Sequence, residues 1–385
     1  MLKRCLIDPT DLLRFDFGPT HPFKIHRLGL AYDLIEATGL LDLPTVYSLE
    51  PREATPSEAT AFHSQGYIET LRLASNSMWV PQMFAHGLNT SDNPVFPDVY
   101  QWAMLVAGAS IRCAEEILEG RADRAFNMSG GLHHALPSRA SGFCHVNDGA
   151  LAIHRLLNER RRVAYVDIDA HHGDGVQHAF YRRADVLTIS VHQTGHTIFP
   201  GTGFVEETGD GGGVGTSINV PLLPGSGDAA YERTFEAIIL PAIEAYRPDV
   251  LVTQLGADAI LGDAVANLRL SLHEFERCVL RFRDLGIPWL ALGGGGYDVG
   301  NVVRAWTLAW GAIVDHAVPD EVPPEWMTRA AGFGVAVSRM RGRVERTPTS
   351  DAALVDLEHT IDVLNETVLP TLPTDRPRTV GPEGR

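Results

Sequence analysis

Residues 167–174, with the sequence Asp-Ile-Asp-Ala-His-His-Gly-Asp, combine carboxylate and imidazole groups at a spacing that could bind a metal ion. The apolar, β-branched run before them, residues 162–166, is typical of a buried strand. Because strand side chains alternate, Asp167, Asp169 and His171 are expected on one face. Ionisable groups at such a place are costly unless a cation or a partner neutralises them. The alternative is a helix start with one of the aspartates as its cap. The metal interpretation is favoured because α/β folds bind ligands beyond the carboxyl ends of strands.

A second segment of this kind holds two adjacent histidines. His133 and His134 follow a strand-like run, residues 126–128, and a pair of glycines. They could serve as metal ligands, as a general-base pair or as ordinary structural histidines. The sequence of this segment alone leaves the three alternatives open.

A third carboxylate completes the set. Asp258 follows the apolar run 250–254, and by itself it would be interpreted as a helix cap. Together with Asp169 and His171 it forms a three-ligand site with an open position, which is the arrangement of catalytic zinc.

These groups need a scaffold, and the hydrophobic pattern predicts one. Apolar runs alternate with amphipathic segments, which favours one α/β domain with a mainly parallel sheet and helices on both faces. The expected strands are residues 5–7, 163–168, 186–192, 250–254 and 289–292. The expected helices are residues 99–119, 148–160, 228–246, 272–285 and 302–315, with Asp148 and Asp228 as cap or first-turn residues.

Glycine runs and the chain ends complete the outline. Residues 211–213 are expected to form a surface turn, whereas the glycines at 293–296 follow a buried strand and precede Tyr297, which should face the metal pocket. We expect one folded domain over residues 1–369 and a disordered tail over 370–385, which is rich in Pro, Thr, Arg and Gly. Residues 319–350 show only a weak pattern.

Composition limits the possible partners. Of the 385 residues, 44% are hydrophobic and 21% charged, as in a soluble globular protein, and the net charge is −16. This charge argues against direct nucleic-acid binding. No run is long and apolar enough to span a membrane, and no signal peptide is evident. The four cysteines form no CxxC pair, which excludes a thiolate zinc site of that type. We therefore expect a cytoplasmic protein.

An ordered series of motifs runs from about residue 18 to residue 306. It comprises GPTHPFKIHR (18–27), SGGLHHA (129–135), GFCxxND (142–148), DIDxHHGDG (167–175), FPGTG (199–203), GADxxxGD (256–263), GGGGY (293–297) and RAW (304–306). In these motifs the chain resembles the histone deacetylase family, class I-like, and within it the bacterial acetoin-utilisation deacetylases. The resemblance implies the arginase/deacetylase-like fold and metal-dependent removal of an acyl group from an amine.

The resemblance also implies roles for the polar residues. Zinc would be held by Asp169, His171 and Asp258, although iron(II) also suits this mixed N/O set. By the same resemblance, the catalytic residues would be a base, an orienting histidine, their two carboxylate partners and an oxyanion donor: His134, His133, Asp174, Asp167 and Tyr297.

A lysine channel is implied as well. By resemblance Phe143 and Phe199 form opposing walls and Gly142 lines one side. Asp92 matches the rim carboxylate that receives the N–H groups of the substrate backbone. Arg27 matches a buried arginine at the inner end, where it could attract the leaving acetate, with a structural salt bridge as the alternative.

A monovalent cation is a further implied ligand. Potassium would lie close to the zinc, bound through backbone carbonyls near Asp167, Asp169 and His171 and through Ser190. A second potassium site is expected in the segment between Phe180, Arg183 and Val186.

The expected substrate is an acetylated lysine in a protein, with a metabolic enzyme such as an acetyl-CoA synthetase as the candidate. Val265 stands where acetylpolyamine-specific relatives carry an acidic gatekeeper, which disfavours a free polyamine. Two alternatives are kept: a deacetylase of small acylated amines such as acetylpolyamines, and an acyl-lysine binding protein without catalysis. A two-manganese ureohydrolase ranks low, because additional carboxylate ligands would be needed near His133 or Tyr297.

Overall fold

The computed structural model describes residues 3–76 and 80–373, and it contains one sheet of eight parallel strands. The order across the sheet is β2-β1-β3-β8-β7-β4-β5-β6. This confirms the predicted α/β fold with a mainly parallel sheet. The strands are β1 (Arg4–Ile7), β2 (Val46–Leu49), β3 (Arg124–Asn127), β4 (Val163–Asp167), β5 (Val186–Gln193), β6 (Ser217–Leu222), β7 (Val250–Gln254) and β8 (Trp289–Leu292).

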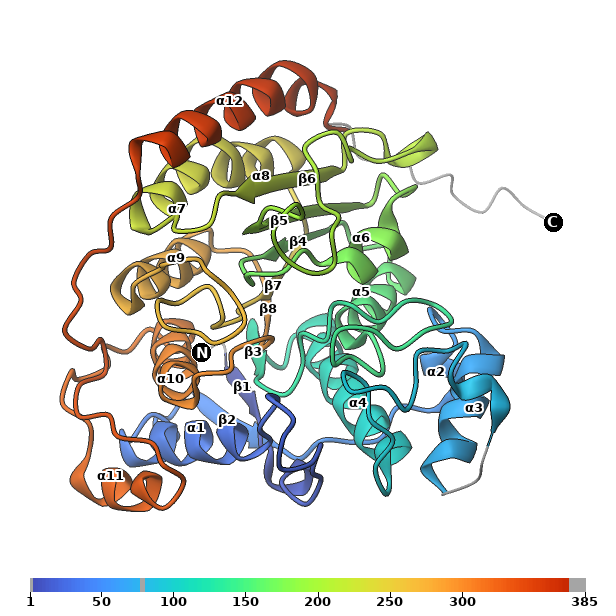
Figure 1. Cartoon of the computed structure of the whole chain (residues 1–385), viewed down its shortest axis with the longest axis vertical. Helices are drawn as coiled ribbons and strands as arrows, with labels where there is room; N and C mark the ends of the chain where they lie inside the picture. The colour runs from blue at the N-terminus through green and yellow to red at the C-terminus, as the bar shows by residue number, and fades with distance from the viewer. Residues whose placement is uncertain (1–2, 77–79, 374–385) are drawn as a thin grey trace.

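Helices cover both faces of this sheet (Figure 1). On one face lie α4, α5 and α6, and on the other lie α1, α10, α9, α7 and α8, with α12 beside the edge strand β6. The helices are α1 (His26–Ala37), α2 (Pro56–Ala59), α3 (Gln65–Ser75), α4 (Val99–Leu118), α5 (Asp148–Asn158), α6 (Asp174–Phe180), α7 (Asp228–Thr234), α8 (Leu240–Tyr246), α9 (Leu272–Asp284), α10 (Val299–Ile313), α11 (Pro324–Ala331) and α12 (Asp351–Thr367). A π-helical stretch, Phe235–Ile239, joins α7 to α8.

Burial on both faces explains the composition of the central strands. Every residue of β4, β5 and β7 is buried. Strands β4 and β7 are accordingly nearly continuous apolar runs, whereas β5 alternates apolar residues with the buried polar residues Thr188, Ser190 and His192. The amphipathic helix α9 instead buries one stripe, whereas α4 and α10 are buried on nearly every side. In α9 this stripe is Leu272, Phe275, Val279 and Phe282, and Ser271 caps the helix by accepting a hydrogen bond from the Glu274 N–H.

The strand order determines where loops meet. Strands β3, β8, β7 and β4 are consecutive neighbours, and all are parallel. Their carboxyl ends therefore lie along one edge, and the loops after them meet above the middle of the sheet. The segments that hold the three candidate metal ligands, the paired histidines and Tyr297 each follow one of these four strands.

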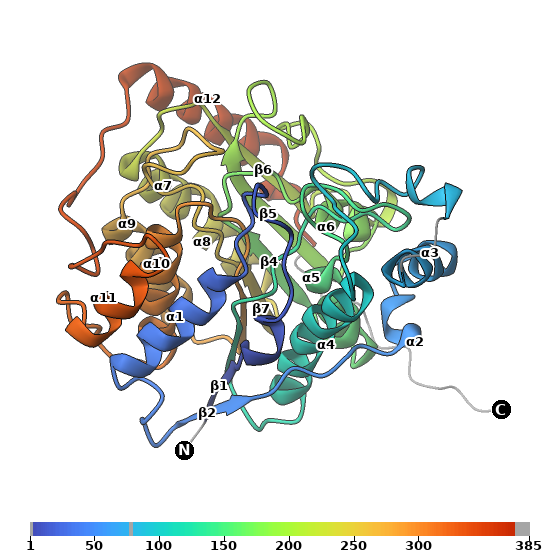
Figure 2. The same ribbon diagram turned by 60° about the horizontal axis from the view of Figure 1, so that its bottom comes forward.

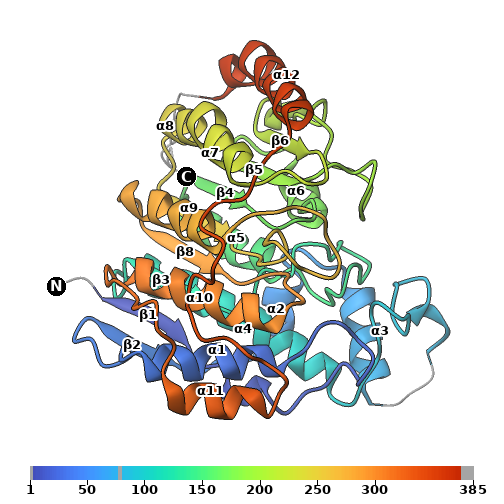
Figure 3. The same cartoon turned by 60° about the vertical axis from the view of Figure 1, so that its left-hand side comes forward.

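Most of the region with a weak sequence pattern, residues 332–350, is an extended segment that we call the strap. Between α11 and α12 the chain runs across α9 and α10 (Figure 3), and α11 itself lies against α1. On the opposite side, α2 and α3 lie beyond α4 (Figure 2).

The C-terminal segment packs further than residue 369. Leu369–Thr371 forms a 3₁₀ turn and Leu372 is buried, whereas the predicted tail beyond residue 373 lies outside the described residues. Within the described part of the chain, no helix has the length and apolar character needed to cross a lipid bilayer.

The five predicted strands and five predicted helices all exist; β7 and β8 have the predicted ends, and the ends of the others are shifted. The expected helix over residues 228–246 is α7, the π-helical stretch and α8 in series. The structure adds elements that the pattern did not predict: β2, β6, α1, α2, α3, α6, α11 and α12.

Candidate functional site

Three side chains converge at the carboxyl ends of β4 and β7. The ligand atoms of Asp169, His171 and Asp258 all lie within 4.8 Å of one another. The Nδ1 atom of His171 is 3.2 Å from Asp169 Oδ1 and 3.0 Å from Asp258 Oδ2. The structure thus brings together the three predicted metal ligands.

The residues present fit a divalent cation. Asp169 and Asp258 are buried with only one imidazole between them. Burial and the charge of Asp169 raise the pKa of Asp258 to about 7. The negative charge on one carboxylate therefore disfavours ionisation of the other. A dication would neutralise both, and the donor set of one imidazole and two carboxylates suits zinc or iron(II).

Neighbouring groups hold the carboxylates in place. The side-chain amide of Gln254 donates to Asp169 Oδ2 at 2.6 Å, and the backbone N–H of Gly295 donates to the same oxygen at 2.9 Å. The N–H of Ala170 donates to Asp258 Oδ1 at 2.8 Å. Such contacts orient metal ligands, so both aspartates are positioned in advance.

The paired histidines lie beside this cluster, each with a carboxylate partner. His133 Nδ1 is 2.7 Å from Asp167 Oδ2, and His134 Nδ1 is 2.7 Å from Asp174 Oδ1. Their Nε2 atoms face each other at 3.0 Å. The hydroxyl of Tyr165 donates to Asp167 Oδ2 at 2.7 Å, which orients that carboxylate.

The two imidazoles differ in basicity. Burial lowers the pKa of His133, but Asp167 and Asp169 outweigh it and raise the pKa to about 9. Burial and the charge of His133 lower the pKa of His134 to about 4. His133 is therefore protonated on both ring nitrogens, and His134 stays neutral, with its Nδ1 hydrogen directed at Asp174 and a lone pair on Nε2.

The loop that carries the histidines is held by a buried carboxylate. Asp148 accepts hydrogen bonds from the N–H groups of Gly131 at 3.1 Å and Leu132 at 2.8 Å. The side chain that caps α5 belongs instead to Asn147, which accepts from the Ala150 N–H at 2.9 Å. Asp148 is thus a first-turn residue whose side chain serves the histidine loop.

Tyr297 follows the glycine run after β8. Its backbone N–H donates to Asp263 Oδ2 at 2.7 Å, and the N–H of Asp298 donates to the same oxygen at 3.2 Å. Burial, together with Asp258 and Asp169, raises the pKa of the Tyr297 phenol well above its ordinary value, so the hydroxyl keeps its proton. That hydroxyl has no hydrogen-bond partner among the described residues.

Arg27 holds the same glycine run through hydrogen bonds to its backbone carbonyls. It is 2% exposed, and its guanidinium donates to the carbonyls of Gly296 at 2.7 Å and Gly294 at 2.8 Å. The ring of Phe23 stacks on it at 4.1 Å. Arg27 makes no ion pair with a described residue, so the alternative of a structural salt bridge is wrong, and carbonyl contacts hold the side chain instead.

A narrow pocket leads to these groups. It is lined by Phe23, Gly131, Leu132, His133, His134, Gly142, Phe143, Cys144, Asp169, His171, Gly294, Gly295 and Tyr297. The Phe143 ring meets the Tyr297 ring edge to face at 5.6 Å, and the half-exposed Phe199 ring meets His134 at 4.9 Å. A Cβ atom on Gly142 would lie 2.5 Å from His134 Cδ2 and 2.8 Å from Phe199 Cε1, so only glycine fits there.

The predicted rim residues lie on neighbouring loops. Asp92 is exposed, and its carbonyl is 3.2 Å from Nε2 of His21, whose ring meets Phe143 at 4.7 Å. Val265 is half-buried, and its N–H donates to Asp263, the residue that also holds Tyr297. Their roles toward a substrate stay predictions.

Ser190 lies beside the carboxyl end of β4. In the β4–β5 pair it stands opposite Asp167, and both are buried. Its Oγ is 2.8 Å from His192 Nδ1.

Sequence reasoning missed three residues that position the site: Gln254, Asp263 and Asp148. Asp148 and Asp263 stand in the GFCxxND and GADxxxGD motifs, which was the available signal. Gln254 is the last residue of β7, where a buried amide side chain needs partners.

Comparison with known proteins agrees with this geometry. The model of the histone deacetylase domain matches residues 21–313. The chain is 42% identical to histone deacetylase 9 of Arabidopsis thaliana over 309 residues, which are 80% of this chain and 72% of that protein. It is 38% identical to histone deacetylase clr6 of Schizosaccharomyces pombe over 315 residues, which are 81% of this chain and 77% of that protein.

The fold is similar to that of a solved bacterial protein. The crystal structure of a histone deacetylase homologue from Aquifex aeolicus superimposes with a TM-score of 0.85 at 32% identity, covering 93% of this chain and all of that one. Sequence and fold agree over most of the chain, and it belongs to the histone deacetylase family of hydrolases.

Proposed function

We propose that the protein removes acetyl groups from lysine side chains by metal-dependent hydrolysis. One observation carries this proposal: the Asp169, His171 and Asp258 cluster opens into the same pocket as His134 and Tyr297. Metal-dependent amide hydrolysis requires a metal site, a general base and a donor to the oxyanion, arranged around one pocket.

The metal's contribution can be stated separately. When bound at the three ligands, zinc or iron(II) would polarise the amide carbonyl and lower the pKa of the attacking water. Everything else is supplied by the chain.

His134 acts as general base and then as general acid. Its Nδ1 is held by Asp174, so the ring is oriented and Nε2 can take a proton from the attacking water. The water oxygen bonds to the acyl carbon. Cleavage of the C–N bond follows, and His134 returns the proton to the departing nitrogen, giving acetate and a free lysine amine. His133, charged and held by Asp167, stabilises the developing negative charge.

Tyr297 stabilises the carbonyl oxygen as it becomes negative. Its hydroxyl is protonated and without a described partner, so it can donate to the substrate. Asp263 fixes the backbone at this position.

For the substrate we propose a lysine within a protein, with a metabolic enzyme such as an acetyl-CoA synthetase as the candidate. Phe143 lines the pocket, Phe199 packs against the lining residue His134, and aromatic faces suit a methylene chain. Val265 brings no charge that would select a polyamine. Acetoin-utilisation subtype and cytoplasmic location stay predictions.

We also keep the potassium proposal. The pairing of Asp167 with Ser190 places the serine beside the loop whose carbonyls would bind the ion. A second site between Phe180 and Val186 would lie where α6 ends and β5 begins.

The test is steady-state kinetics with defined metals. Acetyl-, propionyl- and butyryl-lysine peptides are compared with acetylputrescine, using wild-type protein and the variants His134→Ala and His316→Ala, the latter an exposed histidine outside the site. We expect turnover of acetyl-lysine that His134→Ala abolishes and His316→Ala preserves. A strong preference for acetylputrescine would overturn the protein substrate, and binding without turnover would revive the non-catalytic alternative.

A further inference from the structure

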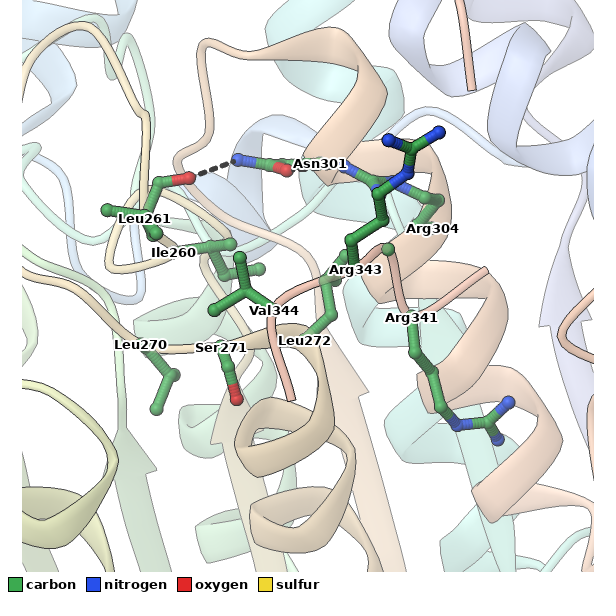
Figure 4. A pocket seen from close by; sticks show the side chains of 11 residues that line it. Ile260, Leu261, Leu270, Ser271, Leu272, Asn301, Arg304, Arg341, Arg343 and Val344 are labelled. Atoms are coloured by element: carbon green, nitrogen blue, oxygen red, sulfur yellow. Dashed lines mark hydrogen bonds between the residues drawn. The ribbon is translucent and has the colours of Figure 1, made fainter. Parts of the chain in front are cut away.

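A second pocket lies where the strap crosses α9 and α10 (Figure 4). It has a cavity of about 120 Å³. Its lining shares no residue with the candidate active site and consists of Ile260, Leu261, Leu270, Ser271, Leu272, Asn301, Arg304, Arg341, Gly342, Arg343 and Val344. Three arginines and no carboxylate are unusual for a protein with a net charge of −16.

Arg304 carries a positive charge that is not neutralised by any carboxylate among the described residues. Its Nε donates to the carbonyl of Gly300 at 2.8 Å, and one terminal nitrogen donates to Asn301 Oδ1 at 2.7 Å. These contacts fix the guanidinium and leave the other terminal nitrogen, Nη1, facing Gly342. Burial lowers the pKa of Arg304, and Asp298 offsets this only in part. Among the described residues Arg304 makes no ion pair.

The two arginines of the strap, Arg341 and Arg343, differ in their contacts. Arg341 is bound by Glu276, with nitrogen-oxygen distances of 2.6 Å and 2.5 Å, and in Figure 4 its side chain points away from the apolar residues. Arg343 is exposed and has neither a hydrogen bond nor an ion pair to any described residue. The pocket therefore keeps two positive charges, on Arg304 and Arg343.

The remaining wall is apolar. Ile260, Leu270 and Leu272 are buried beneath it, and Val344 is 45% exposed above it. The hydroxyl of Ser271 already donates to Asp228 at 2.8 Å, so it adds no free donor. A ligand here would meet hydrocarbon on one side and guanidinium groups on the other.

We infer that this pocket binds a small organic carboxylate with a short hydrocarbon or ring portion. Guanidinium groups recognise carboxylates through paired hydrogen bonds, and an anion would compensate the partly buried charge of Arg304. The site is separate from the proposed deacetylase chemistry and does not depend on it.

Benzoate is a suitable probe for the metal-loaded protein. Binding is followed by saturation-transfer NMR, with benzamide as the uncharged analogue and inorganic phosphate as the anion without hydrocarbon. The variants are Arg304→Gln and Arg343→Gln. Arg182→Gln is the control, since it removes the same charge from a side chain that is 74% exposed and outside the pocket. Because Arg343 makes no described contact, its variant tests the site even if Arg304→Gln fails to fold.

We expect saturable binding of benzoate and much weaker binding of benzamide and phosphate. Each pocket variant should weaken benzoate binding by about tenfold or more, the usual loss for a charge-assisted hydrogen bond, and Arg182→Gln should change nothing. Benzoate binding that survives Arg343→Gln unchanged would place the ligand elsewhere, for example on the metal, and would overturn the inference. Equal binding of benzamide would overturn it as well.

Discussion

Replacing Tyr297 by phenylalanine removes one oxygen atom from the proposed active site. The hydroxyl has no described protein partner, so its loss leaves no donor or acceptor unsatisfied. The ring should stay in place, because it packs edge to face against Phe143 at 5.6 Å and its backbone N–H is bound by Asp263. The effect should therefore fall on turnover and not on folding.

The expected loss follows from the role of the hydroxyl. Removing one oxyanion-hole donor usually lowers kcat about 10²–10³-fold, or about 2.7–4 kcal/mol of transition-state stabilisation. Since burial and the neighbouring aspartates keep the phenol protonated, the full value should apply near neutral pH. KM should change little, because the contact strengthens only as negative charge develops.

The assay is turnover of an acetyl-lysine peptide by wild-type protein, Tyr297→Phe and Tyr32→Phe, with thermal unfolding measured for each. Tyr32 is a matched control. Its hydroxyl donates a hydrogen bond to the Ser48 side chain at the protein surface, and both residues lie far from Tyr297 along the chain. We expect loss of kcat in Tyr297→Phe alone, with unfolding temperatures preserved. A Tyr297→Phe variant that keeps kcat within about threefold of wild type would refute the oxyanion role.

Three further perturbations test other parts of the site. His134→Ala should lower kcat by about 10²–10⁴-fold without loss of metal, measured by kinetics and metal analysis; near-normal turnover would exclude a general-base role. Asp258→Ala should lose metal on dialysis faster than wild type, and equal retention would remove Asp258 from the ligand set. Gly142→Ala adds a Cβ that would lie 2.5 Å from His134, at a φ of +51°, so kcat should fall about tenfold or more; unchanged kinetics would show that the site can relax.

The location of the site was predictable because it depends on strand order alone. Polar residues such as Asp169 and Asp258 follow fully buried parallel strands, and the carboxyl ends of neighbouring strands share an edge. The motif series added His133, His134 and Tyr297 to the same edge. The structure places all of these around one cluster.

The two outer strands were missed for physical reasons. Strand β6 contains Pro221, which normally argues against a strand and is tolerated here because β6 is an edge of the sheet. Strand β2 forms the other edge, and its residues Val46–Leu49 are mostly half-buried. An edge strand with little burial lacks the apolar run that marks a central strand.

The contacts that orient the candidate catalytic groups lay beyond sequence reasoning. Gln254 reaches Asp169 across 85 positions, and Arg27 reaches Gly294 across 267. Such pairs depend on how loops settle after the sheet forms, and no local pattern encodes them. The use of Asp148 to hold the histidine loop belongs to the same class.

The most direct test of the account is metal titration of chelator-treated protein, with zinc and iron(II) in separate series and acetyl-lysine hydrolysis as the readout. We predict that activity returns and saturates at one divalent ion per chain, and that Asp258→Ala fails to respond at the same metal concentration. Full activity in the chelated protein, or saturation only at two ions per chain, would contradict a single-metal centre at Asp169, His171 and Asp258.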